Sequence, residues 1–369
     1  YFVDNIQRDG DGNMWFATGD GGLSRMEGWS ASPQSPTRWR NWGNHNDQSE
    51  PNPFAGNEPM YSMHEDANGL IWMGGNGVAR WDPVTGMFLN FWNWQNSSLG
   101  VDSFVAIEED GNGDIWIASD YTGLYRLNPE TDDWEQHLFG APFSTANEVH
   151  DMVRDLDGNL WVATLTSLHF FNGQTWFAVG AIHGSPVQEP RALAVHPDGS
   201  LWIGASNGLI RYQDGTWTIY DPSNSPMITA EVHGLDIRED GVIGMSLSKF
   251  QSLTPFPNGV VLFDPTPGAE TWDIYTYEDD GLPHYQLGDV EFDSGGNLWV
   301  STISEGVTRI NVGRTTPAPS PDLNGDGVVD GADLGLLLAA WGTSSPAADL
   351  NQDGVIDGAD LGALLAAWS

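Results

Sequence analysis

The chain has 369 residues, and its 13 Lys and Arg against 51 Asp and Glu give a formal net charge of −38. This charge argues against nucleic acid as a partner, because phosphate recognition needs clustered basic side chains. An anionic membrane surface is disfavoured for the same reason, whereas divalent cations are attracted. The 45 Gly, 22 Pro and 18 Trp indicate short strands and tight turns, since helical proteins avoid Gly and Pro.

The chain contains no cysteine, so neither disulfide bonds nor thiol chemistry holds it together. No apolar run approaches the roughly 20 residues that span a bilayer, so membrane insertion is not expected. The sequence begins at Tyr1 and not at Met, which we interpret as a mature or trimmed form whose export signal is gone. We therefore expect a secreted protein, extracellular or at the cell surface.

The first 310 residues contain seven copies of one motif, spaced roughly 41 to 57 residues apart. Each copy has an apolar stretch that ends in an acidic residue, a turn rich in Gly or Asn, and a second apolar stretch. Ile243 stands at the anchoring position of the sixth copy, and tryptophan occupies that position in the others, namely Trp15, Trp72, Trp116, Trp161, Trp202 and Trp299. Repetition at this period is typical of propeller blades.

Each motif predicts four strands, of which the last carries an aromatic pair, as in TWTIY from Thr216. Seven such units predict a mainly β chain, folded over residues 1–312 as a seven-bladed β-propeller with the tryptophans wedged between neighbouring blades. In the seventh unit GVTRINVG is followed directly by TTPAPSPD, so no fourth strand is evident. Two interpretations follow: an open edge that invites strand addition from another chain, or a three-stranded blade covered by a loop.

The motif D-x-x-G-x-L-W-x-G-T-x-x-G-L, which these copies approximate, resembles the repeats of two-component-regulator propellers over about residues 1–310. That family implies a sensor or binding scaffold, so the motif is specific for the fold and weak for the function. In places the repeats are also similar to streptogramin-lyase-like propellers. A shared fold does not imply lyase activity.

A Pro-rich linker of the stiff, extended kind covers residues 313–321. Two near-identical segments follow, DLNGDGVVDGADLGLLLAAWG from Asp322 and DLNQDGVIDGADLGALLAAWS from Asp349. Each places oxygen-bearing side chains at loop positions 1, 3, 5, 9 and 12 with Gly at 6, as an EF-hand-type calcium loop does. We expect two Ca²⁺ ions, bound by Asp322, Asn324, Asp326, Val328 (backbone carbonyl), Asp330 and Asp333, and by Asp349, Asn351, Asp353, Val355 (backbone carbonyl), Asp357 and Asp360.

The tail, residues 322–369, resembles a type I dockerin: each half is a loop followed by a helix, giving a small all-α domain. The resemblance implies calcium-dependent folding and docking on a cohesin partner. The chain departs from the family at loop positions 10 and 11, where Gly331, Ala332, Gly358 and Ala359 stand in place of the usual Ser or Thr. Because the helices are apolar nearly all round, we expect a hydrophobic partner surface that includes Leu336, Leu337, Trp341, Leu364, Leu365 and Trp368.

A second set of polar residues falls near the start of the inner strands: His64, His150 and His233, with Glu148 and Glu231 beside them. These residues could ring the central channel, where a His/Glu pair is able to do acid–base chemistry, although such residues more often line a wet channel. No Ser-His-Asp signature, phosphate loop or zinc spacing is present.

The sequence therefore favours a non-enzymatic extracellular structural or binding protein, assembled through its calcium-loaded tail. The docking partner is a cohesin-like domain or a neighbouring copy of the chain, and identical subunits that dock head to tail can form an open filament. The alternative is a polysaccharide-active or lyase-type propeller enzyme that its dockerin delivers. A glycan is a further candidate ligand.

Overall fold

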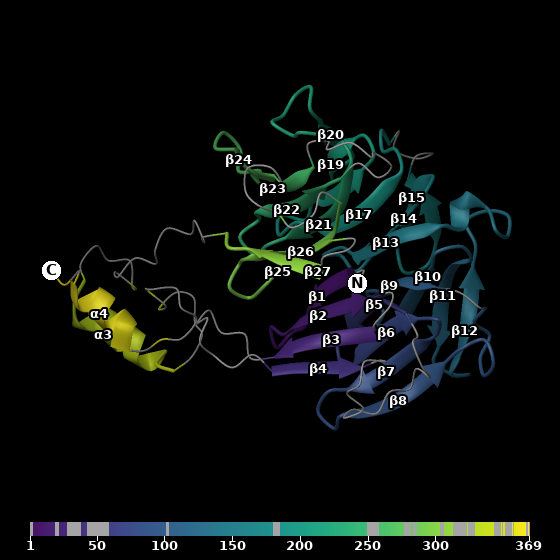
Figure 1. Cartoon of the computed structure of the whole chain (residues 1–369), viewed down its shortest axis with the longest axis horizontal. Coiled ribbons are helices and arrows are strands. Elements are labelled where there is room, and N and C mark those ends of the chain that lie inside the picture. Colours follow the sequence, from purple (N-terminus) through teal and green to yellow (C-terminus); the bar gives the residue numbers. More distant parts are fainter. Residues whose placement is uncertain are drawn as a thin grey trace.

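The computed structural model describes residues 3–18, 22–27, 38–42, 59–100, 103–179, 185–248, 258–276, 282, 286–302, 306–312, 323, 329–342, 348, 350, 356, 358–366 and 368. Within them the chain forms seven antiparallel sheets, one short 3-10 helix and two α-helices (Figure 1). None of these helices is long and apolar enough to cross a membrane in the part of the chain that is described.

Six sheets have four strands each, and each strand pairs with its neighbour in sequence. The first two sheets contain β1 (Val3–Arg8), β2 (Met14–Thr18), β3 (Gly22–Glu27) and β4 (Arg38–Trp42), then β5 (Met60–Glu65), β6 (Ile71–Gly75), β7 (Val78–Asp82) and β8 (Met87–Trp92). The third and fourth contain β9 (Phe104–Glu109), β10 (Ile115–Ser119), β11 (Gly123–Asn128) and β12 (Asp133–His137), the short 3-10 helix η1 (Thr145–Asn147), then β13 (Val149–Arg154), β14 (Leu160–Thr164), β15 (Ser167–Phe171) and β16 (Trp176–Ala178).

The remaining sheets follow the same up-and-down order. The fifth and sixth contain β17 (Pro190–Val195), β18 (Leu201–Ala205), β19 (Gly208–Gln213) and β20 (Thr216–Tyr220), then β21 (Val232–Ile237), β22 (Ile243–Leu247), β23 (Gly259–Asp264) and β24 (Thr271–Thr276). The seventh contains β25 (Leu287–Phe292), β26 (Leu298–Thr302) and β27 (Gly306–Ile310). Among the described residues it has three strands, where every other sheet has four.

The first strands of the seven sheets pack side by side and close a ring, because β1 contacts both β5 and β25 (Figure 1). The inner edge of each blade is thereby confined to the central channel, where it is short and protected. The predicted seven-bladed β-propeller is therefore confirmed, and the inner strands line its central channel.

The repeated acidic turn is held by the tryptophan that follows it. In the first blade the Asp9 carboxylate accepts hydrogen bonds from the Asn13 backbone N–H (2.7 Å) and from the Trp15 indole N–H (2.8 Å). The same Asp-to-indole bond recurs at Trp72, Trp116, Trp161 and Trp299. One carboxylate thus fixes the turn and satisfies the donor of a buried indole, which explains the spacing of Asp and Trp in the sequence.

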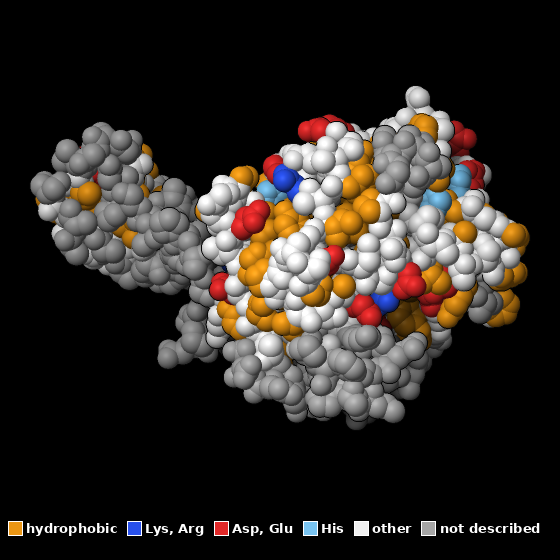
Figure 2. All heavy atoms as spheres, turned by 90° about the horizontal axis from the view of Figure 1, so that it is seen from above, with side chains coloured by type: hydrophobic (Ala, Val, Ile, Leu, Met, Phe, Trp, Pro, Cys, Tyr) orange, Lys and Arg blue, Asp and Glu red, His pale blue; other side chains and the backbone are white. Residues whose placement is uncertain are grey.

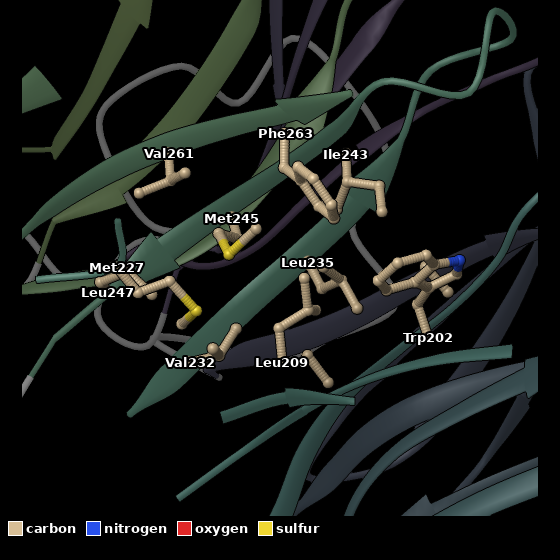
Figure 3. Close-up of a cluster of buried hydrophobic side chains, with 12 residues drawn as sticks. Trp202, Leu209, Met227, Val232, Leu235, Ile243, Met245, Leu247, Val261 and Phe263 are labelled. Atoms are coloured by element: carbon tan, nitrogen blue, oxygen red, sulfur yellow. The ribbon is translucent and has the colours of Figure 1, made fainter. Parts of the chain in front are cut away.

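The cores lie between neighbouring blades, as the tryptophan pattern predicts. Figure 3 shows the core between the fifth and sixth blades, where Trp202 of β18 and Leu209 of β19 face Val232, Ile243 and Phe263 of the next blade. Trp202 is fully buried and stacks on Tyr220 of its own outer strand, with ring centroids 5.7 Å apart. Ile243, which replaces tryptophan in the sixth copy, is also fully buried, so the packing position is kept although the aromatic ring is lost.

The C-terminal residues form helices α3 (Gly331–Ala339) and α4 (Gly358–Ala366), which pack on each other. Their core consists of Leu337, Ala348, Leu350, Ile356 and Leu364, all at most 7% exposed. The two halves are also joined by a backbone hydrogen bond from Gly342 to the Ile356 carbonyl (2.9 Å). Each repeat therefore buries its apolar residues against its twin.

Candidate functional site

Asp330 and Asp333 shape the end of the first predicted calcium loop. Asp330 caps helix α3: its side chain accepts from the Ala332 N–H (2.8 Å), and the Asp333 carboxylate in turn accepts from the Asp330 N–H (2.9 Å). The second oxygen of Asp333 accepts from the backbone N–H of Leu323, at loop position 2 (2.8 Å). This reciprocal capping fixes the carboxylate of Asp333, at predicted loop position 12, between the start of helix α3 and Leu323.

The charge of this region favours a bound cation. Asp333 and Asp360, the two residues at loop position 12, are both fully buried. Residues 315–369 contain no Lys, Arg or His, and their acidic residues are Asp322, Asp326, Asp330, Asp333, Asp349, Asp353, Asp357 and Asp360. Buried carboxylates without a cation are costly, so this composition fits a unit that encloses a metal ion.

The other predicted calcium ligands fall outside the described residues: Asp322, Asn324, Asp326, Val328, Asp349, Asn351, Asp353, Val355 and Asp357. Among the described residues no group of three or more His, Asp and Glu side chains is arranged to hold a metal ion. The fit of this region to calcium therefore depends on the donor types and on the placement of Asp330, Asp333 and Asp360.

The six residues expected to contact a partner separate into two groups. Leu337 and Leu364 are fully buried in the helix–helix core, so they do not present a surface, because the helical period turns them toward the twin repeat. The remaining four are half exposed, at 44–52% for Leu336, Trp341, Leu365 and Trp368. Leu338, which was not among the predicted residues, is also half exposed, at 51%.

At the propeller channel, every inner strand carries a register irregularity near its start. A bulge of this kind redirects a side chain out of the regular pleat. In three successive blades the redirected residues are His150, Arg191 and His233, which line one cavity of about 280 Å³ together with Asp4 and Asp289. Arg191 was not among the predicted residues, although the repeated Glu-x-basic pattern at Glu148, Glu189 and Glu231 points to it.

Within this cavity the two histidines lie near acidic partners. His150 Nε2 is 3.8 Å from Glu148 Oε1, and His233 Nε2 is 3.9 Å from Glu231 Oε2. Arg191 Nη1 lies 2.6 Å from His233 Nε2. Burial, reinforced by the Arg191 charge, lowers the pKa of His233 to about 3, so its imidazole is neutral at physiological pH.

His64 does not join the other two histidines. It is 9% exposed, absent from the lining of that cavity, and its Nε2 is 4.0 Å from Glu108 Oε1. Burial lowers the pKa of His64 to about 4 and raises the pKa of Glu108 to about 7. The predicted ring of three histidines is therefore wrong in this respect: two share a cavity and the third is packed elsewhere between inner strands.

In the same cavity, half-buried carboxyl groups join neighbouring blades. Asp151 accepts from the Leu193 N–H of the next blade (2.7 Å), and Asp289 accepts from the Ile6 N–H across the ring closure (2.8 Å). Burial raises the pKa of Asp151 to about 8 and that of Asp289 to about 7. These side chains are structural links that become charged only in neutral to alkaline solution.

A family model confirms the assignment of the tail. Residues 320–366 match the dockerin type I domain. The C-terminal unit is a dockerin type I domain. Dockerin type I domains bind calcium, they assemble proteins through a cohesin partner, and they occur in extracellular proteins. The fully buried Asp333 and Asp360 thus lie at the loop ends of a calcium-binding domain.

The propeller is similar to solved structures of several classes. One is the extracellular domain of a protein described as a hybrid two-component system from B. thetaiotaomicron, at 15% identity and TM-score 0.63 over 85% of this chain and 39% of that one. Another is a streptogramin B lyase, at 15% identity and TM-score 0.61 over 83% of this chain and 92% of that one. A third is a virginiamycin B lyase from Staphylococcus aureus, at 13% identity and TM-score 0.60, over 84% of this chain and 94% of that one.

At these identities the likeness establishes the propeller fold and nothing about activity. The chain spans well under half the length of the first of these proteins, with 39% covered. No curated protein matches the chain. The dockerin domain is therefore the part of the molecule whose family carries functional information.

Proposed function

We propose that the chain is a non-enzymatic extracellular binding protein, in which a propeller of residues 1–312 is carried by a dockerin domain of residues 322–369 through a linker of residues 313–321. The observation that carries this proposal is the dockerin match together with two fully buried position-12 aspartates in a region without basic side chains. Such a unit is held folded by cations, and its family docks on protein partners.

The calcium sites are assigned as two EF-hand-type loops with one ion each. Their ligands are the side chains of Asp322, Asn324, Asp326, Asp330, Asp333, Asp349, Asn351, Asp353, Asp357 and Asp360, with the backbone carbonyls of Val328 and Val355. Isothermal titration of the chelated protein with Ca²⁺ tests this assignment. Two bound ions per chain support it, and one or none contradicts it. Asp360→Asn should remove one of the two binding events, because it weakens the second loop alone.

The partner surface is assigned to the exposed apolar side chains of the helices, Leu336, Leu338, Trp341, Leu365 and Trp368. A partner of matching character is a cohesin domain with an apolar face, which would cover these half-exposed Leu and Trp side chains. A double variant, Leu336→Ser with Leu365→Ser, should abolish capture by a panel of cohesin domains while calcium binding persists. Capture that is unchanged in this variant contradicts the assignment.

The same surface can dock on a neighbouring copy of the chain, and light scattering separates the two cases. Ordered polymers in millimolar Ca²⁺ that dissociate on chelation support self-docking and a filament. Monomers in both conditions support a foreign cohesin partner.

The alternative function is catalysis at the channel mouth, on a polysaccharide or by a lyase reaction. The observation that favours it is the cavity lined by His150, Arg191 and His233, where histidine and carboxylate groups lie within 4 Å of each other. The double variant His150→Ala with His233→Ala tests it. Turnover of a polysaccharide panel that disappears in this variant supports an enzyme, and turnover that survives the replacement excludes these residues.

A further inference from the structure

The seventh blade differs from the others at its outer edge. In six blades the third strand pairs with a fourth strand. In five of them, the residue directly after the hairpin glycine of the third strand lies opposite an aromatic ring of the fourth strand. These pairs are Leu23 and Trp42, Val78 and Trp92, Leu124 and His137, Leu209 and Tyr220, and Val260 and Tyr275. Those five aliphatic residues are at most 1% exposed. Val307 occupies the same position in β27, and it is only half-buried.

The fourth strands also share a sequence pattern. An aromatic residue stands three positions before the ring described above, in the pairs Trp39 and Trp42, Trp134 and His137, Trp217 and Tyr220, and Trp272 and Tyr275. In three blades the second ring stacks on the blade's anchoring tryptophan, at 5.2 Å for Trp15 on Trp42, 5.7 Å for Trp72 on Trp92 and 5.7 Å for Trp202 on Tyr220. The other blades thereby define which strand fits beside β27.

The backbone of β27 is oriented to accept such a strand. In the fifth blade, Asp214 (φ 50°) and Gly215 (φ 79°) form a two-residue turn, so the flanking pair Gln213 and Thr216 is hydrogen-bonded across the β19–β20 hairpin. Since alternate residues of a strand face the same neighbour, Leu209 also directs its N–H and C=O toward β20. Val307 is the counterpart of Leu209, so its N–H and C=O face the outer side of β27. Within the described residues no strand pairs with that side.

We propose that the outer edge of β27 binds an extended segment of a partner protein, which completes the seventh blade as its fourth strand. The segment runs antiparallel to β27 and carries two aromatic residues three positions apart, the second of them opposite Val307. Affinity comes from main-chain hydrogen bonds, and selectivity comes from the aromatic ring that covers Val307. This surface is separate from the dockerin domain, so the chain would have two independent docking sites.

A peptide copied from the protein's own fifth blade serves as the probe. It has the sequence of residues 215–221, Gly-Thr-Trp-Thr-Ile-Tyr-Asp, with blocked ends and a fluorescent label, and the control peptide has serine in place of both aromatic residues. We expect saturable binding of the first peptide to the calcium-loaded protein of residues 1–369 and none of the second. Val307→Pro should weaken binding about tenfold, because proline removes an outward N–H and leaves the inward bonds to β26 intact. Val307→Thr keeps that N–H and should retain binding within about threefold.

Amide hydrogen exchange supplies a second readout that does not depend on the variants folding. In the free protein the Val307 amide should exchange much faster than the Leu209 amide, and the probe peptide should slow it. Three results would each overturn the proposal: no saturable binding, equal binding by Val307→Pro and the wild type, or a Val307 amide as protected in the free protein as that of Leu209. The last result would mean that the chain covers this edge itself.

Discussion

Two adjacent leucines on helix α3 provide a matched test of how the dockerin domain is held together. Leu337 is fully buried among Leu350, Ile356 and Leu364, whereas Leu336 is 47% exposed. Leu337→Ala removes side-chain volume from a closed core, which costs about 2–5 kcal/mol. A unit of this length has a free energy of unfolding of only ~2–7 kcal/mol, so most of its stability is lost. Leu336→Ala removes contacts on one side only and gains slightly in helix propensity, so its effect is within about 0.5 kcal/mol.

Calcium affinity reports this difference because ligand binding and folding of the unit are linked. Isothermal titration of the full chain with Ca²⁺ should show at least a 30-fold weaker apparent affinity for Leu337→Ala, which corresponds to about 2 kcal/mol. Leu336→Ala should change the affinity less than about threefold. Similar losses in both variants would refute the assignment of Leu337 to the core and Leu336 to the surface. Unchanged affinity in both would refute the linkage between packing and calcium binding.

Three further predictions concern the metal, the channel and the blade cores. Removal of calcium with a chelator should abolish the helical circular-dichroism signal of α3 and α4 and leave the thermal transition of the propeller in place; helices that persist without metal would contradict the calcium assignment. Burial raises the pKa of Asp151 to about 8, above its value of about 4 in the unfolded chain. Protonated Asp151 therefore stabilises the folded state fully below about pH 4, and this stabilisation is lost as the pH rises through 8. The melting temperature of the propeller should therefore fall from pH 5 to pH 8.5, and the fall should be smaller in Asp151→Asn; an equal fall would assign the pH dependence to other groups. Trp202→Ala should lower the free energy of unfolding by about 3–5 kcal/mol, because the indole is fully buried and stacked on Tyr220. Denaturant unfolding measures this free energy, and a loss below about 1 kcal/mol would show that this core tolerates the cavity.

The fold was predictable because each blade repeats the same physical solution. Asp9 and Trp15 are six residues apart since one carboxylate both closes the turn and accepts the indole N–H, and that geometry recurs in five blades. The sixth copy, with Ile243, was still recognisable from its apolar strand and its spacing. The dockerin domain was predictable for a similar reason, because the oxygen-bearing residues of such a domain recur at a spacing that a calcium ion requires.

The details of the sites depended on three-dimensional effects that no single residue type signals. The bulge in each inner strand determines which side chain enters the channel, so His150 and His233 share a cavity with Arg191 while His64 is packed against Glu108. In the dockerin helices, leucines at neighbouring positions have the same hydropathy, and only the packing of the two repeats decides which are buried. The apolar character of the helices was therefore predictable, whereas the leucines that face solvent were not.

The position of β27 has a mechanical consequence for a protein attached through its tail. The strand is the last element of the propeller before the segment that leads to the dockerin domain, and in the described part of the chain it is held by β26 on one side. Tension applied through a docked tail enters the propeller at Ile310, the end of β27 that pairs with Leu298. A load applied at this end peels the strand away one hydrogen bond at a time and does not shear all its bonds together. The outer strand of the seventh blade would then yield at low force, while β25 keeps its contacts with β1 and β21 and the ring stays closed.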